Sequence, residues 1–183
     1  MPIFVGYKPI QIMQIVKDQY FEGERPFYTC RDGLYLENVV IGPGESAIKE
    51  GANIEAVHCE FKGKYPFWEC DNFTVRNCIF REGARAALWY TRGCKMYDTL
   101  VEAPKMFRRI EGVYLENVQM PMAQETFWDC KDIKLRNVYT ADANYIFMHC
   151  ENIDIDGYEL HGNYSFQYVK NAVIRNANLQ TKD

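Results

Sequence analysis

The chain has 183 residues, of which 48% are hydrophobic, 15% aromatic and 25% charged, and its formal net charge is −4. A chain of this length and apolar content can bury a core within one domain, which excludes an intrinsically disordered protein. Lys and Arg form no runs and no apolar stretch approaches the roughly 18 residues of a membrane span, so neither a nucleic-acid nor a membrane partner is expected.

The opening MPIFVGYKPIQIM does not have the pattern of a signal peptide. We interpret residues 1–13 as a lead-in and residues 14–25 as an incomplete first coil, followed by repeats over residues 26–183 within a single domain 1–183. The cysteine count is odd, seven, and no export signal precedes the repeats. Free thiols and a cytoplasmic location are therefore predicted.

From Pro26 onwards a motif of 19 to 21 residues occurs eight times, most visibly as PFWEC at 66–70 and TFWDC at 126–130. A fixed period of this size is typical of solenoids, in which each repeat stacks on its neighbours. One column of the repeat holds large apolar residues, namely Phe27, Ile48, Phe67, Leu88, Phe107, Phe127, Phe147 and Phe166. We expect this column to lie in the core.

Later in each repeat, apolar and polar residues alternate, as in Ile133, Lys134 and Leu135. This alternation predicts strands with one buried face. No repeat contains the roughly ten residues of 3.6-residue periodicity that a helix needs. The predicted fold class is all-β, a right-handed parallel β-helix of about eight coils with a spacing of about 4.8 Å.

An Asn column supports this fold, because Asn tolerates the left-handed backbone of a sharp turn and its amide can bond to the next coil. Its members are Asn38, Asn77, Asn117, Asn137 and Asn176, with His58, Asp98 and Gly157 in the other coils. The cysteines also fall into columns, as with Cys130 and Cys150, and are interpreted as buried thiols. Neither a metal site nor a cofactor is predicted.

The column after the large apolar position is the main candidate for binding. It reads Tyr28, Lys49, Trp68, Trp89, Arg108, Trp128, Met148 and Gln167. Aromatic faces beside cations suit the stacking of sugar rings, so an oligosaccharide is the expected ligand. The predicted ligand-binding residues are Lys49, Trp68, Arg85, Trp89, Arg108 and Trp128. Packing under a neighbouring loop and a dimer contact are the alternatives.

Glu50 and Glu69 fall in the next column, on neighbouring coils, and are the candidate catalytic acid and base. Carboxylates about 5–5.5 Å apart are used by retaining glycosidases. The alternative is a solvated acidic edge neutralised by Lys49 and Arg85. Whether the chain is an enzyme stays open; if it is, the class is glycoside hydrolase or polysaccharide lyase.

The loop motifs are similar to those of an uncharacterised bacterial family, a domain of unknown function with a pectate-lyase-like, single-stranded right-handed β-helix. They are FEGERPFY (21–28), FKGKYPFW (61–68), EGARAALWY (82–90), APKMFR (103–108), AQETFW (123–128) and GNYSFQYVKN (162–171). The resemblance covers roughly residues 20–183 and implies the β-helix fold, but no activity. The calcium-binding Asp cluster and paired Asp residues of pectate lyases and polygalacturonases have no match in register.

Two hypotheses of function follow. The first is polysaccharide binding or processing along the Trp and basic stripe. The second is a non-catalytic structural or protein-interaction scaffold that self-associates. The repeats stop soon after Leu179 without a capping helix. Either the chain is a truncated form of a longer β-helix or self-association covers the end, and we expect the second, a homo-oligomer formed through the uncapped solenoid end or through the exposed stripe.

Overall fold

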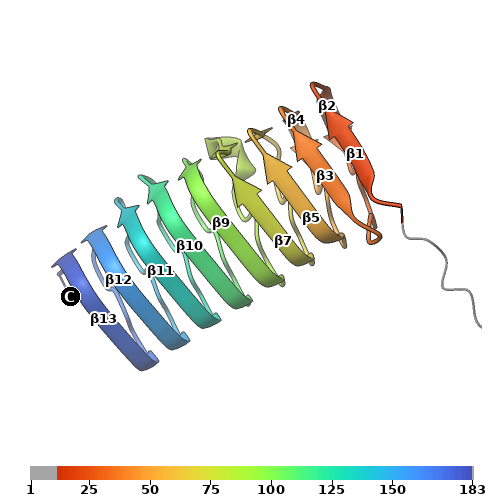
Figure 1. The fold of residues 1–183 in the computed structure, drawn as a ribbon. Helices are drawn as coiled ribbons and strands as arrows, with labels where there is room; N and C mark the ends of the chain where they lie inside the picture. The colour runs from red at the N-terminus through yellow and green to blue at the C-terminus, as the bar shows by residue number, and fades with distance from the viewer. Residues whose placement is uncertain (1–11, 183) are drawn as a thin grey trace, which may run out of the picture.

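A computed structural model describes residues 12–182, which form an elongated right-handed parallel β-solenoid of about eight turns (Figure 1). Most of the predicted lead-in 1–13 lies outside the described residues. All strand pairs are parallel, and the main row follows the order β1-β3-β5-β7-β9-β10-β11-β12-β13. The predicted fold class is confirmed.

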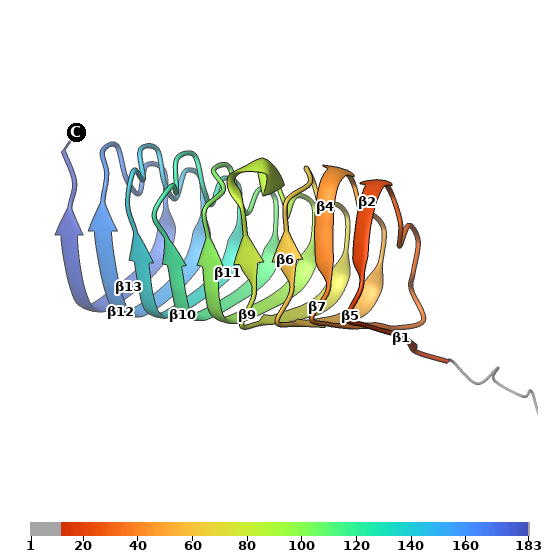
Figure 2. The same cartoon turned by 90° about the horizontal axis from the view of Figure 1, so that it is seen from above.

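Each of the early coils contributes two short strands, whereas each coil from β9 onwards contributes one long strand that continues through a corner (Figure 2). The strands are β1 (Gln14–Lys17), β2 (Tyr20–Glu24), β3 (Leu34–Glu37), β4 (Val40–Glu45), β5 (Ala52–Val57), β6 (Glu60–Phe61), β7 (Asp71–Arg76), β8 (Ile79–Phe80), β9 (Arg92–Val101), β10 (Glu111–Met120), β11 (Lys131–Thr140), β12 (Glu151–His161) and β13 (Lys170–Gln180). The described residues contain a single helical turn, η1 (Glu82–Ala84), and no helix able to cross a membrane.

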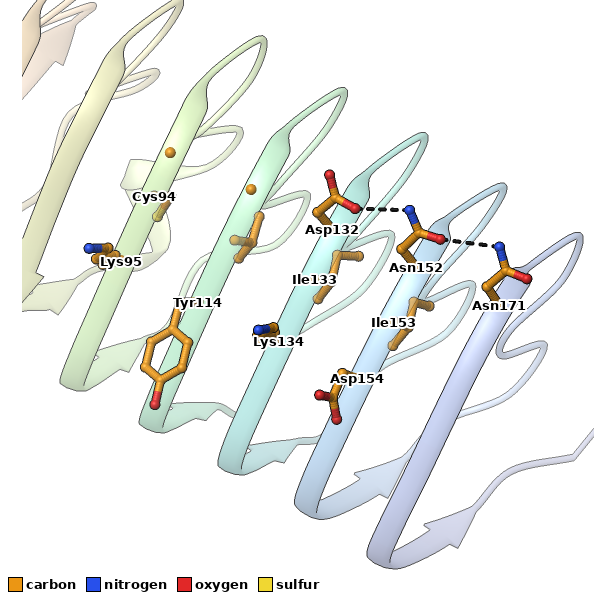
Figure 3. A pocket seen from close by; sticks show the side chains of 13 residues that line it. Cys94, Lys95, Tyr114, Asp132, Ile133, Lys134, Asn152, Ile153, Asp154 and Asn171 are labelled. Atoms are coloured by element: carbon orange, nitrogen blue, oxygen red, sulfur yellow. Dashed lines mark hydrogen bonds between the residues drawn. The ribbon is translucent and has the colours of Figure 1, made fainter.

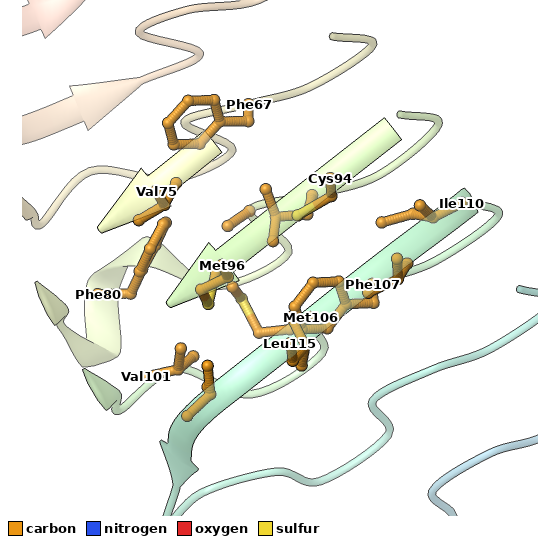
Figure 4. Packing of buried hydrophobic residues seen from close by; sticks show 14 of the residues in the cluster. Phe67, Val75, Phe80, Cys94, Met96, Val101, Met106, Phe107, Ile110 and Leu115 are labelled. Carbon is orange, nitrogen blue, oxygen red and sulfur yellow. The ribbon is translucent and has the colours of Figure 1, made fainter. Parts of the chain in front are cut away.

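The core runs along the axis of the solenoid, and similar residues at equivalent positions of successive coils stack on one another. The rings of Phe107, Phe127 and Phe147 are fully buried and nearly parallel, with centroids 4.7 and 4.8 Å apart. This distance equals the normal spacing between strands, so in-register pairing places the rings in contact. Figure 4 shows the same core around Phe67, with aliphatic side chains filling the space between coils. The predicted burial of this column is confirmed except at Phe166, which is partly buried.

The corners of the prism depend on residues with left-handed backbone. Asn137 has φ of 52°, and its Nδ2 donates to Oδ1 of Asn117 at 2.8 Å, while Asn117 donates to Asp98 at 3.0 Å. The predicted Asn ladder is therefore present in these coils. It is interrupted at Gly157, where the Asn176 amide instead reaches Asp156, at 2.7 Å.

A second ladder lies at the second residue of several strands, where the backbone turns with positive φ. The Asn72 amide donates to Asn53 at 2.8 Å, and the Asn152 amide donates to Asp132 at 2.9 Å. Asn171 continues the series by donating to Asn152 at 3.2 Å. Both ladders connect side chains of adjacent coils at positions where the backbone turns sharply.

Asn137 provides a test of the ladder. Replacing Asn137 with Ala removes the hydrogen bond to Asn117 and leaves at positive φ a side chain that cannot form a compensating hydrogen bond. The free energy of unfolding should therefore fall by about 1–2 kcal/mol. Asn137→Gly removes the same bond but relieves the backbone, and should recover part of the loss. Urea unfolding of the three proteins measures both terms; equal stability of wild type and Asn137→Ala would contradict the proposed role.

Candidate functional site

Apart from Arg85, the residues predicted to bind ligand lie along one corner of the solenoid, beside turn residues with positive φ. These turn residues are Thr29, Glu50, Glu69, Tyr90, Arg109, Asp129, His149 and Tyr168. Parallel bridges join Trp89 to Arg108, Arg108 to Trp128, and Trp128 to Met148. The stripe read from the sequence is therefore continuous in space over these coils.

Side chains of the stripe stack on one another. Trp68 and Trp89 have ring centroids 5.0 Å apart at an interplanar angle of 34°. The guanidinium of Arg108 lies 5.0 Å from the centroid of Trp89 and 4.2 Å from that of Trp128. Cation–π attraction therefore acts on both faces of the guanidinium. The stripe is a preformed stack in which several aromatic faces already have a protein partner.

Polar atoms of the stack are also engaged. The indole N–H of Trp89 donates to the carbonyl of Lys105 at 2.9 Å, and that of Trp128 donates to the carbonyl of Tyr145 at 2.6 Å. Nη2 of Arg108 lies 2.7 Å from the carboxylate of Glu125, and only 19% of the Arg108 side chain is exposed. These contacts fix the orientation of the rings and of the guanidinium.

Exposed tyrosines surround the stack. They are Tyr28, Tyr90, Tyr145, Tyr164 and Tyr168. Tyr145 stacks on Tyr164 with centroids 4.9 Å apart, and Tyr168, which is 75% exposed, stacks on His149 at 4.7 Å. We call the surface formed by the stack and these five tyrosines the aromatic corner.

The two candidate catalytic carboxylates lie at this corner on adjacent coils. Glu50 accepts a hydrogen bond from the Tyr28 hydroxyl at 3.3 Å and lies 3.5 Å from the ammonium of Lys49. Glu69 accepts from the indole N–H of Trp68 at 3.3 Å. Both carboxylates are thus partly or largely solvated and have local polar partners.

A groove of about 600 Å³ lies beside Glu50 and Glu69. Its central carboxylate, Asp71, is bound by Arg92 at 2.8 Å and by Arg31 at 2.8 Å. The Arg92 guanidinium, followed by that of Arg31, holds the pKa of Asp71 below its usual range. Tyr90 and Arg109 line the same groove. The groove therefore combines an aromatic ring with charges of both signs.

Arg85 is separated from the rest of the predicted set. It is exposed and lines a different hollow with Lys64, Glu82 and Pro104. Lys49, in contrast, shares a small hollow with Trp68 and Tyr65. Of the two cations expected to neutralise the acidic edge, Lys49 lies at Glu50, and Arg85 forms no ion pair within residues 12–182.

Several features of this region were not predicted from the sequence. Arg31 reaches Asp71 across the intervening coil, because that coil carries the short residue Ala52 in the same column. The second ladder was also missed, although Asn53, Asn72 and Asn152 recur at the period of the repeat. The recurrence of Asn at this position of the repeat would have predicted the ladder. Within residues 12–182, no group of three or more His, Cys, Asp or Glu side chains is placed to hold a metal ion.

Comparisons with known proteins define the family but give no activity. Residues 14–183 match a family described as "Protein of unknown function (DUF3737)". No curated protein matches the chain. Among solved structures, two trypsin-treated forms of QnrB1, described as a plasmid-mediated fluoroquinolone resistance protein, are similar. The first has 11% identity and a TM-score of 0.30, covering 91% of this chain and 90% of that chain. The second has 10% identity and a TM-score of 0.26, covering 92% of each.

Arg108 is the residue that tests the stack. Arg108→Lys keeps the positive charge but loses the planar group between Trp89 and Trp128, so a loss of about 1–2 kcal/mol and a change in tryptophan emission are expected. Arg108→Gln, which removes the charge as well, is the comparison. If both variants unfold at the same urea concentration as the wild type, the stack does not stabilise the corner.

Proposed function

The chain belongs to the DUF3737 family of proteins of unknown function, and we propose that it is a non-catalytic β-solenoid scaffold that self-associates through the aromatic corner. The observation that carries this proposal is the fixed stack of Trp68, Trp89, Arg108 and Trp128 beside exposed tyrosines. Trp, Tyr and Arg are the residue types most enriched in the energetic centres of protein interfaces.

Pre-organisation supports an interface at this corner. Ordering flexible side chains on association costs free energy, and side chains that are already fixed avoid much of that cost. The indole N–H groups of Trp89 and Trp128 bond to backbone carbonyls, and Arg108 is held between two rings. Such a surface can bury aromatic area with little further loss of side-chain entropy.

The charges of the corner favour a second copy of the chain as partner. A two-fold interface places the same patch on both sides, so the patch must complement itself. The turn column carries Glu50, Glu69 and Asp129 together with Arg109. Carboxylates of one copy therefore have a guanidinium available on the other.

The state of the cysteines supports a cytoplasmic protein, the location predicted from the sequence. All seven are free thiols, and six of them are buried. Burial raises the pKa of the Cys70 thiol to about 12, which keeps it protonated and unreactive at neutral pH. A reducing compartment preserves such thiols without further protection.

Self-association is tested by sedimentation velocity over a wide range of protein concentration. The wild type should show a concentration-dependent increase in sedimentation coefficient. Tyr90→Ser combined with Tyr145→Ser removes two exposed rings from the middle of the corner and should weaken association at least tenfold, as expected for interface aromatics worth about 1.4 kcal/mol or more.

Tyr20→Ser is the matched control, because Tyr20 is 56% exposed and lies in β2, outside the corner. It should assemble like the wild type. A wild type that stays monomeric throughout overturns the proposal. Assembly that persists unchanged in the double variant favours the alternative route through the solenoid end.

Oligosaccharide binding is a second candidate, favoured by the groove in which Tyr90 lies beside Glu50, Glu69, Asp71 and Arg92. Carboxylates and guanidinium groups bond to sugar hydroxyls, and aromatic rings stack on sugar faces. In this candidate Glu50 and Glu69 would act as acid and base, in the manner of the paired carboxylates of retaining glycosidases.

Tryptophan fluorescence tests this candidate. Titration with a broad panel of neutral and acidic oligosaccharides should alter the emission of Trp68 and Trp89 if sugars bind, and Trp89→Phe should reduce the response. Glu69→Gln should abolish any cleavage while sparing binding. Absence of a response across the panel excludes the second candidate and leaves the scaffold proposal unaffected.

A further inference from the structure

A second hollow, separate from the aromatic corner, opens on the outer face of β9–β13 (Figure 3). Its volume is about 500 Å³. One side is formed by the second ladder, whose members Asp132, Asn152 and Asn171 are connected by hydrogen bonds. Between this part of the ladder and its Asn72 end there are two positions without side chains, because Gly93 and Gly112 occupy the ladder position in β9 and β10.

Close packing does not require these two glycines. An added Cβ on Gly93 or Gly112 would find its nearest backbone atom at 3.6 Å, an ordinary contact distance. At Gly157 in the first ladder, the corresponding distance is 3.2 Å, which is tight. Neighbouring coils carry Asn72 and Asp132 at the same corner with φ of 51° and 57°. Gly93 and Gly112 have φ of 71° and 80°, a left-handed conformation that most side chains disfavour but that Asn and Asp adopt in the neighbouring coils. The space would accept an Asn at either position, and the lack of side chains there opens the hollow.

Two lysines flank the open part of the hollow. Tyr114 is paired in register with Lys95 on one side and with Lys134 on the other, and Figure 3 shows the three side chains on successive strands. Both lysines are exposed, and neither forms an ion pair within the described part of the chain. The Tyr114 hydroxyl donates to Glu116, which holds the ring in place.

Of the two carboxylates of the hollow, Asp154 is paired with two guanidinium groups, whereas Asp132 keeps its charge and bonds to a neutral amide. Asp154 lies 3.1 Å from Arg136 and 2.6 Å from Arg175, so its charge is offset. Asp132 accepts from the amide of Asn152 and lies on the ladder side. The positive charge not offset by an ion pair thus lies at Lys95 and Lys134, on the opposite side from Asp132 (Figure 3).

We propose that this hollow binds a small aromatic anion. The ring lies over the bare backbone of Gly93 and Gly112, beside Tyr114, and the anionic group lies between the ammonium groups of Lys95 and Lys134. These lysines are attached two strand spacings apart, about 9.6 Å, and their flexible four-carbon stems allow both to reach one phosphate or carboxylate. An apolar floor with a few convergent polar groups is the usual composition of a small-molecule site.

The test is a titration of ¹⁵N-labelled full-length protein, followed by amide chemical shifts, with phenyl phosphate as the probe. Saturable shifts are expected at the amides of Gly93, Gly112 and Tyr114. Inorganic phosphate should bind at least tenfold more weakly, because it lacks the ring. Benzylamine, a cation with the same ring, should produce no saturable shifts there. Equal or tighter binding of benzylamine, or shifts confined to other faces, overturns the proposal.

Two sets of variants separate the ring from the charge. Gly93→Asn with Gly112→Asn fills the hollow with the side chains that neighbouring coils carry, and should weaken phenyl phosphate at least tenfold. Lys95→Gln with Lys134→Gln should have a similar effect while leaving the backbone unchanged. Lys64→Gln, at an exposed lysine outside the hollow, should bind like the wild type. If the double glycine variant does not fold, the double lysine variant alone tests the proposal. Undiminished binding of phenyl phosphate by the double lysine variant contradicts it.

Discussion

Parallel hydrogen bonding between coils is the constraint on which this structure depends. Each coil must follow the path of the one before it, because its backbone groups find their partners there. Residues at equivalent positions consequently lie about one strand spacing apart, and the same column keeps the same orientation along the axis. This places Phe127 between Phe107 and Phe147, and it places Asn137 beside Asn117. Core, corners and surface stripes all follow from one rule.

The same rule explains why the residues of the stripe lie directly beside strained residues. A corner needs left-handed backbone in every coil, and positive φ costs a side-chain-bearing residue about 1–2 kcal/mol. In the second ladder, near the start of the strands, the cost is offset where an Asn amide bonds to the neighbouring coil. At the aromatic corner it is offset by stacking instead: the guanidinium of Arg109 lies 5.5 Å from the ring of Tyr90 and donates to its hydroxyl. Side chains at this corner project outward, and the interactions that stabilise them also make them available to a partner.

The amino-acid sequence predicts those parts of the molecule in which like residues recur. The Phe column and the Asn column were recognised because nearly identical residues return at each period, and identical residues stack well on themselves. The second ladder has a similar mixture of Asn, Asp and Gly, and the common tolerance of these residues for positive φ would have predicted it. The sandwich of Arg108 between Trp89 and Trp128 depends on side-chain rotamers, which columns do not specify. Arg31 contacts Asp71 across an intervening coil, whereas the columns of the repeat predict contacts only between adjacent coils.

In a solenoid, what repeats maintains the fold, so departures from the repeat are the places to look for other roles. Asn and Asp occupy the position of the second ladder in neighbouring coils at positive φ, and Gly93 and Gly112, with φ of 71° and 80°, leave it without side chains although an added Cβ would meet no crowding. The alternation of Trp and Arg along the aromatic corner is similarly more than a turn requires, since Lys49 and Met148 occupy the same column elsewhere. Stability accounts for the regular positions, and it leaves these irregular ones to be explained by what the surface contacts.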